Sequence, residues 1–149
     1  MSFYSQIIAI GRMKKSSPFY SPYQEYEKRL KGKLELLELE GSNQKEELNK
    51  LKSKIDKNAP LIALDETGDV ISSLEFSQKI SKIQNIKTGK FQFVIGGADG
   101  LDGDIRQQAD LVLSFGRLTW PHMLARVMLI EQIYRTQLIL SGHPYHREG

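Results

Sequence analysis

Short apolar runs alternate along this chain with longer segments in which apolar residues recur at helical spacing. The apolar runs predict five strands, at residues 3–10, 34–39, 60–64, 91–95 and 111–113. The intervening and final segments predict helices at residues 23–30, 45–57, 73–85, 103–109 and 121–140. Strands that alternate with helices of this length form a mostly parallel sheet with helices on both faces. We therefore expect a single α/β domain over residues 1–149.

Polar and turn-forming residues set the expected limits of these elements. Ser21 is the expected N-cap of the first helix, and residues 42–43 are expected to cap the second. The Asp-Glu-Thr-Gly cluster at residues 65–68 is expected to form a turn that ends the third strand. Pro121 at the start of the last helix and Gly142 just past its end fit the usual asymmetry of helix termini.

The last predicted helix is apolar on more than one face. Its main apolar residues are Met123, Leu124, Val127, Met128, Ile130, Ile133, Tyr134, Leu138 and Ile139. These exceed the single stripe that a helix turns toward one core, so the helix is either central in its own domain or buried a second time against a partner. The second arrangement predicts a homodimer formed through this helix, and the first remains the alternative.

Composition excludes several classes of protein. The 149 residues include no cysteine, which excludes disulfides, thiolate metal sites and a cysteine nucleophile and is compatible with the cytoplasm. No apolar run approaches the roughly 20 residues of a membrane helix. The basic residues near the N-terminus follow the first apolar run, whereas those of a signal peptide precede it. The net charge of +3 mildly favours an anionic partner such as RNA.

Three loops follow strands at the expected carboxyl edge of the sheet, where open α/β sheets bind ligands. They lie at residues 64–67, 96–101 and 115–120. The glycine loop GGADG, at residues 96–100, lets backbone N–H groups approach a ligand closely. It lacks the Lys-Ser/Thr of a P-loop and is not a GxGxxG fingerprint. Taken alone, it is better explained as a tight turn between a strand and a helix.

The histidines do not form a recognisable metal or nucleophile motif. All three, His122, His143 and His146, lie in the last third of the chain, without HExxH spacing or nearby cysteines, so no metal site is expected. His122 falls in the first turn of the last helix, where the macrodipole disfavours a protonated ring, so a structural role is favoured over a general base. No serine lies in a Gly-x-Ser-x-Gly elbow.

The chain ends in HPYHRE, at residues 143–148. This tail is rich in rings, imidazoles and a guanidinium, which stack on bases and bind phosphate. The tail alone leaves RNA binding and a merely solvated end as equal alternatives.

Four segments together resemble the RlmH family, small SPOUT-class methyltransferases. They are FVIGGADGL, LSFGRLTWPH, a helix reading R-V-x-L-I-E-Q-I-Y-R, and HPYHRE. The resemblance covers nearly the whole chain and is most specific over residues 91–148. Residues 41–57 are only loosely similar and are shortened. Because these motifs occur in this order and spacing, they are far more specific together than any one is alone.

The resemblance implies a trefoil-knotted α/β fold, with the knot region at about residues 91–149, and S-adenosylmethionine as the cofactor. The implied cofactor-binding residues are Leu64, Gly96, Phe115, Gly116, Arg117, Leu118, Thr119 and Trp120, although the family is not uniform at positions 117 and 120. It further implies a homodimer in which the tail of one subunit completes the cofactor pocket of the other. The implied substrate is N3 of a pseudouridine in 23S rRNA, within the assembled ribosome.

The tail supplies the expected catalytic residues. Tyr145 would stack on the target nucleotide, Arg147 would contact a phosphate or carbonyl, and His146 is the best candidate for handling the proton. His146 could equally be a hydrogen-bond donor to RNA. Two other functions remain open: a non-catalytic ribosome- or RNA-binding protein that keeps the same fold, and a phosphate-cradling nucleotide-binding module, against which the absence of a P-loop lysine argues.

Overall fold

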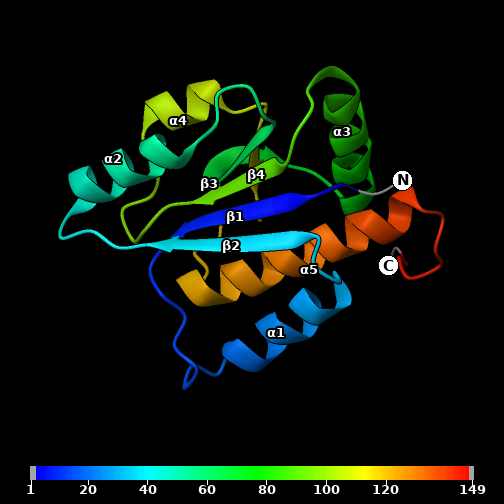
Figure 1. Ribbon diagram of the computed structural model, residues 1–149, viewed down its shortest axis with the longest axis horizontal. Coiled ribbons are helices and arrows are strands. Elements are labelled where there is room, and N and C mark those ends of the chain that lie inside the picture. Colours follow the sequence, from blue (N-terminus) through cyan, green and yellow to red (C-terminus); the bar gives the residue numbers. More distant parts are fainter. Residues whose placement is uncertain (1–2, 148–149) are drawn as a thin grey trace.

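The computed structural model describes residues 3–147, in which strands and helices alternate strictly (Figure 1). The strands are β1 (Ser5–Ile10), β2 (Leu34–Leu39), β3 (Leu61–Val70), β4 (Phe91–Ile95) and β5 (Leu111–Ser114). The helices are α1 (Tyr20–Arg29), α2 (Gln44–Lys54), α3 (Ser73–Ile86), α4 (Gly103–Gln108) and α5 (His122–Leu140). The predicted order of elements is confirmed.

The strands form one parallel sheet in the order β2-β1-β4-β3-β5. Because every ladder is parallel, the carboxyl ends of all five strands lie at the same edge. Residues 64–67 of β3 and the loops that follow β4 and β5 lie at this edge, where the sequence predicts a ligand site.

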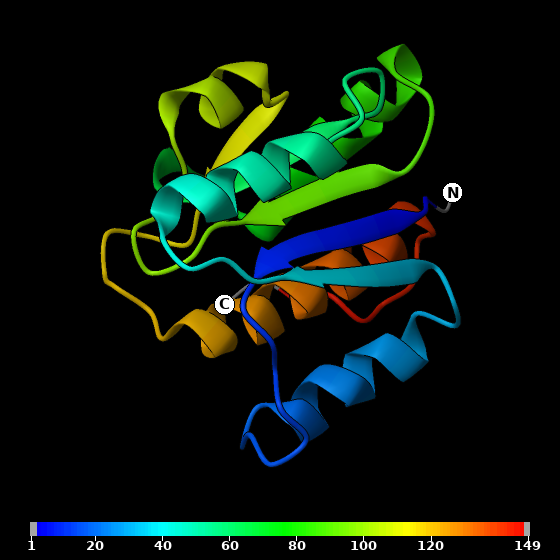
Figure 2. The same cartoon turned by 60° about the vertical axis from the view of Figure 1, so that its left-hand side comes forward.

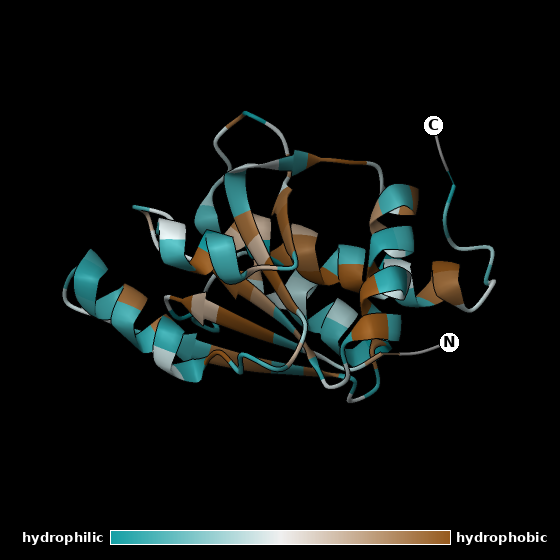
Figure 3. Cartoon of the chain, turned by 90° about the horizontal axis from the view of Figure 1, so that it is seen from above, coloured by the Kyte–Doolittle hydropathy of each residue, from teal (hydrophilic) through white to brown (hydrophobic). Residues whose placement is uncertain are grey.

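Helices cover both faces of this sheet, and the alternation of side chains in β1 shows how. Ile7 and Ala9 pack in a cluster with α1, α3 and α5, whereas Ile8 and Ile10 pack in a second cluster with α2 and α4. Successive residues of a strand point to opposite faces, so a strand buried on both sides is a continuous apolar run. Figure 3 shows the hydrophobic colours gathered on the sheet and on the helix surfaces turned toward it.

Helix α5 crosses one face of the sheet between α1 and α3 (Figure 1). Its side chains from His122 to Leu140 are all at least half-buried within the chain itself. Gly142, at φ +77°, ends it: the N–H of His143 donates to Leu138 O at 2.9 Å, the bond of a Schellman cap. No helix within residues 3–147 has the length and apolar character needed to cross a bilayer.

The predicted start of the first helix is wrong. Helix α1 begins at Tyr20, with Phe19 at the N-cap, so Ser21 lies inside the helix and no side chain caps it. Pro22 lies in the first turn of α1 and does not interrupt it, because the first N–H groups of a helix have no intrahelical partner and a proline there loses no hydrogen bond. The second helix is capped as predicted, because Asn43 accepts from Glu46 N at 2.9 Å. This helix, α2, ends at Lys54, before the predicted limit at residue 57.

The predicted end of the third strand is also wrong. Strand β3 continues past Leu64 to Val70, with a register shift that partners both Leu64 and Asp69 with Leu113 of β5. The shift is possible because Gly68 lies against the backbone of β5: a Cβ at this position would be 2.5 Å from Val112 O. The Asp-Glu-Thr-Gly cluster thus forms an irregularity within the strand and does not terminate it.

Candidate active site

A cleft of about 540 Å³ opens at the carboxyl edge of the sheet, lined by residues of β3 and of the loops that follow β4 and β5. The residues expected to bind a cofactor that line this cleft are Leu64, Gly96, Phe115, Gly116, Leu118, Thr119 and Trp120. Arg117 is exposed and is not among the described residues that line the cleft. Residues of β3 and of the loops after β4 and β5 are therefore brought together, and Arg117 is the one expected cofactor-binding residue outside this lining.

The glycine loop after β4 gives the cleft a wall of backbone atoms. A Cβ on Gly96 would lie 2.7 Å from the carbonyl carbon and oxygen of Gly100, which no real side chain tolerates. Gly97 and Gly100 form an isolated antiparallel bridge, and Gly100 N donates to Gly97 O at 3.0 Å. Gly100 itself has φ +77°, a left-handed conformation that favours glycine. Glycine at position 96 is thus required by the close approach of two backbone segments.

Helix α2 braces the far side of the glycine loop. Gln44 Nε2 donates to Asp99 O at 3.0 Å, and Lys52 Nζ lies 2.5 Å from Asp102 Oδ2. Asp102 also caps α4, accepting from Ile105 N at 3.1 Å. Burial opposes ionisation of Asp102, but the hydrogen bonds from Lys52 and from the helix N-terminus outweigh it, so the pKa of this carboxyl is lowered. Two residues of α2 therefore hold the middle of the loop and the residue that follows it.

The loop after β5 is anchored at both of its ends. Ser114 Oγ accepts from Gly116 N at 3.0 Å and lies 3.2 Å from Glu66 O. Trp120 Nε1 donates to Phe115 O at 3.3 Å, which closes the loop upon itself. Between these anchors the loop turns its side chains to solvent or to the cleft.

Acidic groups make up much of the cleft wall contributed by β3. Asp65 and Glu66 both line the cleft. Asp65 Oδ1 accepts from Thr67 N at 2.9 Å and from Thr67 Oγ1 at 2.7 Å. Arg106 Nη1 lies 3.4 Å from Asp65 Oδ2 but donates at 2.7 Å to Leu101 O, so its charge is shared between two acceptors. This wall is therefore suited to a ligand that carries positive charge.

His122 lies at the start of α5, on the margin of the cleft. Its Nε2 is 2.7 Å from Ile10 O. A carbonyl oxygen only accepts, so Nε2 carries the proton in this contact. The contact fits the structural role predicted for this histidine, because it ties the start of α5 to the end of β1.

A buried ion pair next to His122 was missed by the sequence analysis. Arg126 of α5 is 0% exposed, and its Nη1 donates to Glu38 Oε2 at 2.6 Å. Its Nη2 donates to Gly11 O at 3.1 Å, and Glu38 Oε2 also accepts from Met13 N at 2.7 Å. The pair joins the ends of β1 and β2 to α5. The sequence signal that could have revealed this pair was an arginine within an otherwise apolar helical stretch.

The tail residues lie at the other end of α5. The 19 residues of this helix rise about 1.5 Å each, so its ends are about 28 Å apart. Tyr145 packs on Tyr134 with ring centroids 5.1 Å apart, and Arg135 lies over the Tyr145 ring at 4.9 Å. Arg135 Nη1 contacts His146 Nδ1 at 3.0 Å. The tail therefore folds back on α5, and Tyr145 and His146 lie beside residues 134–135, about 18–20 Å along the helix from its start at the cleft. Glu148 lies outside the described residues.

Burial and the nearby Glu131 carboxylate raise the pKa of Tyr145, so its hydroxyl keeps its proton and remains a donor. Arginine has no acceptor, so His146 Nδ1 must accept from Arg135, and the proton of the neutral imidazole lies on Nε2. The tail is thus held in a defined arrangement on its own helix.

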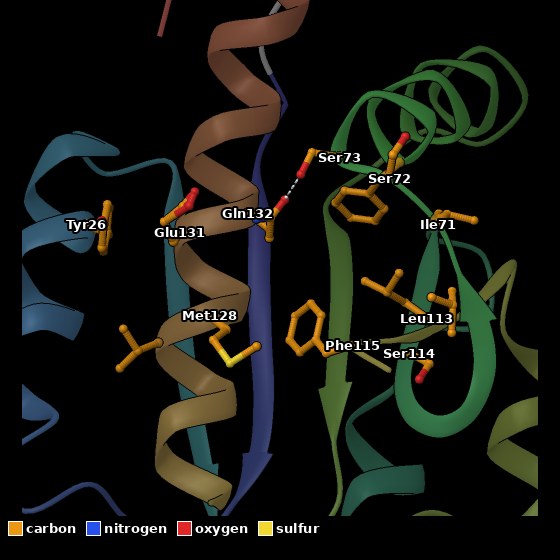
Figure 4. A pocket seen from close by; sticks show the side chains of 13 residues that line it. Tyr26, Ile71, Ser72, Ser73, Leu113, Ser114, Phe115, Met128, Glu131 and Gln132 are labelled. Carbon is orange, nitrogen blue, oxygen red and sulfur yellow. Dashed lines mark hydrogen bonds between the residues drawn. The ribbon is translucent and has the colours of Figure 1, made fainter. Parts of the chain in front are cut away.

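A second cavity, of about 430 Å³, lies between α3, α5 and the end of β5. Figure 4 shows Met128 of α5 and Phe115 pointing toward one another within it. Ser73 Oγ donates to Gln132 Oε1 at 2.7 Å and joins α3 to α5 at its edge. Phe115 belongs to the linings of both cavities, so the two are neighbours across the loop that follows β5.

Comparison with known proteins agrees with this arrangement. Residues 3–146 match the family model described as "Predicted SPOUT methyltransferase". Ribosomal RNA large subunit methyltransferase H of Rhodospirillum centenum is 43% identical over 148 residues, which cover 95% of this chain and 97% of that protein. The chain belongs to the SPOUT methyltransferases and, within them, to the RlmH family. The resemblance drawn from the glycine loop, the Thr-Trp-Pro-His step and the tail is therefore confirmed.

Solved structures of low sequence identity show the same fold. A probable methylase family protein from Haemophilus influenzae superposes with a TM-score of 0.56 at 10% identity, covering 96% of this chain and 70% of that one. The SpoU methyltransferase AviRb from Streptomyces viridochromogenes, solved in complex with AdoMet, has a TM-score of 0.50 at 12% identity, covering 91% of this chain and 58% of that one. The α/β fold of this SPOUT methyltransferase is thus shared well beyond its close relatives.

Proposed function

We propose that this RlmH-family protein transfers a methyl group from S-adenosylmethionine to N3 of a pseudouridine in 23S rRNA, on the assembled ribosome in the cytoplasm. The observation that carries the proposal is the cleft at the carboxyl edge of the sheet, with its backbone wall at Gly96. The identity of 43% to a protein named for rRNA methylation supports the substrate class.

The cleft fits the proposed cofactor in size and in the character of its walls. Its volume of about 540 Å³ lies within the range of about 300–1,000 Å³ that is usual for small-molecule sites. The wall at Gly96 lets backbone groups contact the ligand, and Leu64 and Phe115 offer apolar surface to an adenine ring. Asp65 and Glu66 provide negative charge for a sulfonium and an ammonium group. The AdoMet complex of AviRb, a protein of the same fold, supports this assignment.

Bound S-adenosylmethionine supplies an electrophilic methyl group, and the chain orients the reactants and handles a proton. N3 of a pseudouridine holds its proton at neutral pH, so a group near the cleft must accept it. His146 is the proposed acceptor, and its Nδ1 would exchange the hydrogen bond from Arg135 for the substrate proton, because a neutral imidazole has one acceptor nitrogen. Tyr145 stacks on the target base, and Arg147 binds a phosphate or carbonyl. Holding the two reactants in line accounts for the main part of the rate enhancement.

The separation of tail and cleft leads us to propose a homodimer through α5. In one chain the tail rests on residues 134–135 of α5, about 18–20 Å along the helix from its start at the cleft. A second copy packed antiparallel on α5 would bring its tail to the cleft of the first, and each site would then contain residues of both chains. This contact would use the apolar side chains of α5 that its own chain leaves partly exposed, among them Leu124, Met128 and Leu138.

The role of His146 can be tested by its pH dependence. If His146 accepts the proton, wild type loses activity as pH falls below the histidine pKa, and His146→Ala is slower and lacks that dependence. His143→Ala is the matched control, because His143 lies in the same tail and its ring accepts from Tyr145 N at 3.1 Å. An unchanged pH profile combined with weaker RNA binding would remove the proton-handling role.

Ribosome shape is expected to supply much of the specificity. A chain of 149 residues with a net charge of +3 cannot select one nucleotide among thousands by phosphate contacts alone. We therefore expect isolated rRNA hairpins to be poor substrates compared with whole ribosomes, in a methyl-transfer assay at matched RNA concentration. Efficient modification of a short hairpin would refute this expectation.

One experiment decides the proposed function. The protein is incubated with labelled S-adenosylmethionine and ribosomes from a strain that lacks this methyltransferase, and the modified nucleotide is mapped. We expect one labelled pseudouridine in 23S rRNA. A protein that binds ribosomes but neither binds S-adenosylmethionine in calorimetry nor transfers label would instead be the non-catalytic RNA-binding protein of the same fold.

A further inference from the structure

The mouth of the cleft carries exposed side chains that the cofactor site does not account for. Leu118 is 73% exposed and Trp120 is 39% exposed, although both lie on a loop held at each end by hydrogen bonds. Arg117, between them and Gly116, is exposed and is not among the described residues that line the cleft. A well-anchored loop that keeps large apolar groups in solvent suggests a binding surface.

The indole of Trp120 is suited to stacking. Its single polar atom, Nε1, is already engaged with Phe115 O at 3.3 Å. What the exposed part of the side chain offers to a ligand is therefore apolar ring surface. Every nucleobase has a π-face, and an anchored aromatic ring is the usual platform for an unpaired base.

Basic residues lie near the same mouth on a second loop. Lys14 and Lys15 are exposed on the loop that follows β1. This loop passes beside the start of α5 (Figure 2), where a Cβ on Gly11 would be 3.6 Å from His122 Nε2. Trp120 is two residues before His122 in the chain. Both loops therefore approach the start of α5, and both carry exposed cations, Arg117 on one and Lys14 and Lys15 on the other.

The charges around the mouth of the cleft are unevenly distributed, which indicates the side from which RNA would approach. Three carboxylates, those of Asp65, Glu66 and Asp99, line the cleft on the side of β3 and β4, against one cation, Arg106, which pairs with Asp65. An RNA backbone is repelled by that wall and attracted to the side that carries Arg117 and the loop after β1. The substrate strand would then enter from the basic side, while the acidic wall remains available to a cationic cofactor.

We propose that Trp120 is a stacking platform for an unpaired base of the RNA substrate, and that Arg117 and Lys14 bind phosphates on either side of it. This inference rests on the proposed function, since it requires RNA at the cleft. It assigns Trp120 and Arg117 to the RNA, whereas the family resemblance implies that both bind the cofactor.

Trp120 is the only tryptophan of the chain, so intrinsic fluorescence reports on this position alone. The full-length protein is titrated with a short single-stranded oligouridylate and, separately, with S-adenosylmethionine. We expect the oligouridylate to quench the emission in the absence of cofactor, and S-adenosylmethionine to change it less. Quenching by S-adenosylmethionine alone, with no response to oligouridylate, would overturn the proposal.

Variants then separate stacking from charge in binding to ribosomes. Trp120→Leu should weaken ribosome binding in a pelleting assay by about tenfold, and Trp120→Tyr should restore most of it. Arg117→Ala and Lys14→Ala should each reduce the slope of log K against log[salt] by about one. Lys82→Ala is the matched control, because Lys82 is exposed on α3, which borders the second cavity and lies outside the cleft lining, and it should leave the slope unchanged.

Failure of the proposed function can be distinguished from failure of this inference alone. If wild type neither binds ribosomes nor transfers a methyl group to them, the proposed function itself fails. If wild type is active while Trp120→Leu and Arg117→Ala, folded by thermal melting, weaken S-adenosylmethionine affinity in calorimetry more than ribosome affinity, only the assignment of these residues to RNA fails.

Discussion

Gly96 shows how a single missing side chain shapes the cleft. Its Cα lies against the backbone of Gly100, and a Cβ would approach two atoms there to 2.7 Å. We expect Gly96→Ala to cost about 1–3 kcal/mol of stability, because backbone cannot yield as a flexible side chain does. The shifted loop should also weaken S-adenosylmethionine binding by at least tenfold in calorimetry.

The matched control for that substitution is Gly103→Ala, at the start of α4. A Cβ there would meet only Arg106 Nη2, at 4.0 Å. This variant should bind the cofactor and unfold much as wild type does. Equal behaviour of the two variants would show that the close approach at Gly96 does not determine the shape of the site.

Arg126 illustrates a residue whose importance depends on its partner. Its guanidinium is fully buried and neutralised by Glu38 of β2. Removing one member of a buried pair leaves the other charge unpaired, which typically costs about 3–5 kcal/mol. We expect Arg126→Met to lose stability toward the lower end of that range, since the carboxylate of Glu38 is 22% exposed and still accepts from Met13 N.

Chemical denaturation measures this loss, and a surface pair provides the comparison. Arg12 lies 3.7 Å from Glu40, and both side chains are mostly exposed. Exposed pairs contribute little because solvent screens them, so Arg12→Met should leave the denaturation midpoint nearly unchanged. A similarly small effect at Arg126 would mean that the pair is replaceable by apolar packing.

At the scale of elements, α2 and α4 hold the glycine loop through Asp102. This carboxylate caps α4 and contacts Lys52 of α2, and its pKa is lower in the folded chain. A lowered folded pKa means that the stabilisation is complete above the unfolded value of about 3.9 and is lost as pH falls through the folded value. Asp102→Asn keeps an N-cap but loses the charge, so the stability gap to wild type should close on acidification.

Thermal melts across pH 3–7 check this expectation, with Asp102→Ala as a second variant. Loss of the cap itself costs about 1 kcal/mol, and this part should persist at low pH. A gap between Asp102→Asn and wild type that stays constant with pH would show that the contact with Lys52 does not stabilise the folded chain.

The elements also show what the sequence could and could not predict. The limits of β2 and β4 match the prediction, because a short apolar run is the direct signature of a buried strand. The end of β3 was missed because the Asp-Glu-Thr-Gly cluster has turn chemistry, while its path is decided by contact with Val112 of β5. The cleft loops were placed correctly, but the Arg126–Glu38 pair joins positions 88 residues apart, and no local pattern reveals such a contact.

At the scale of the whole molecule, the arrangement of α5 makes a prediction about assembly. The cleft lies at the start of this helix, whereas Tyr145 and His146 rest on residues 134–135 in its second half, so a complete site requires two chains if the tail acts in it. We expect light scattering to give twice the 17.0 kDa of one chain. A monomer that retains full activity would contradict the proposed dimer directly.

Subunit mixing tests whether the tail acts on the other chain. One variant carries Gly96→Ala in the cleft, and the other carries Tyr145→Ala and His146→Ala in the tail, so each homodimer should be inactive toward ribosomes. In a random mixture, half of the dimers are mixed and each contains one intact site, so about a quarter of the wild-type activity should return. If the tail served the cleft of its own chain, every mixed dimer would have two damaged sites and mixing would restore nothing.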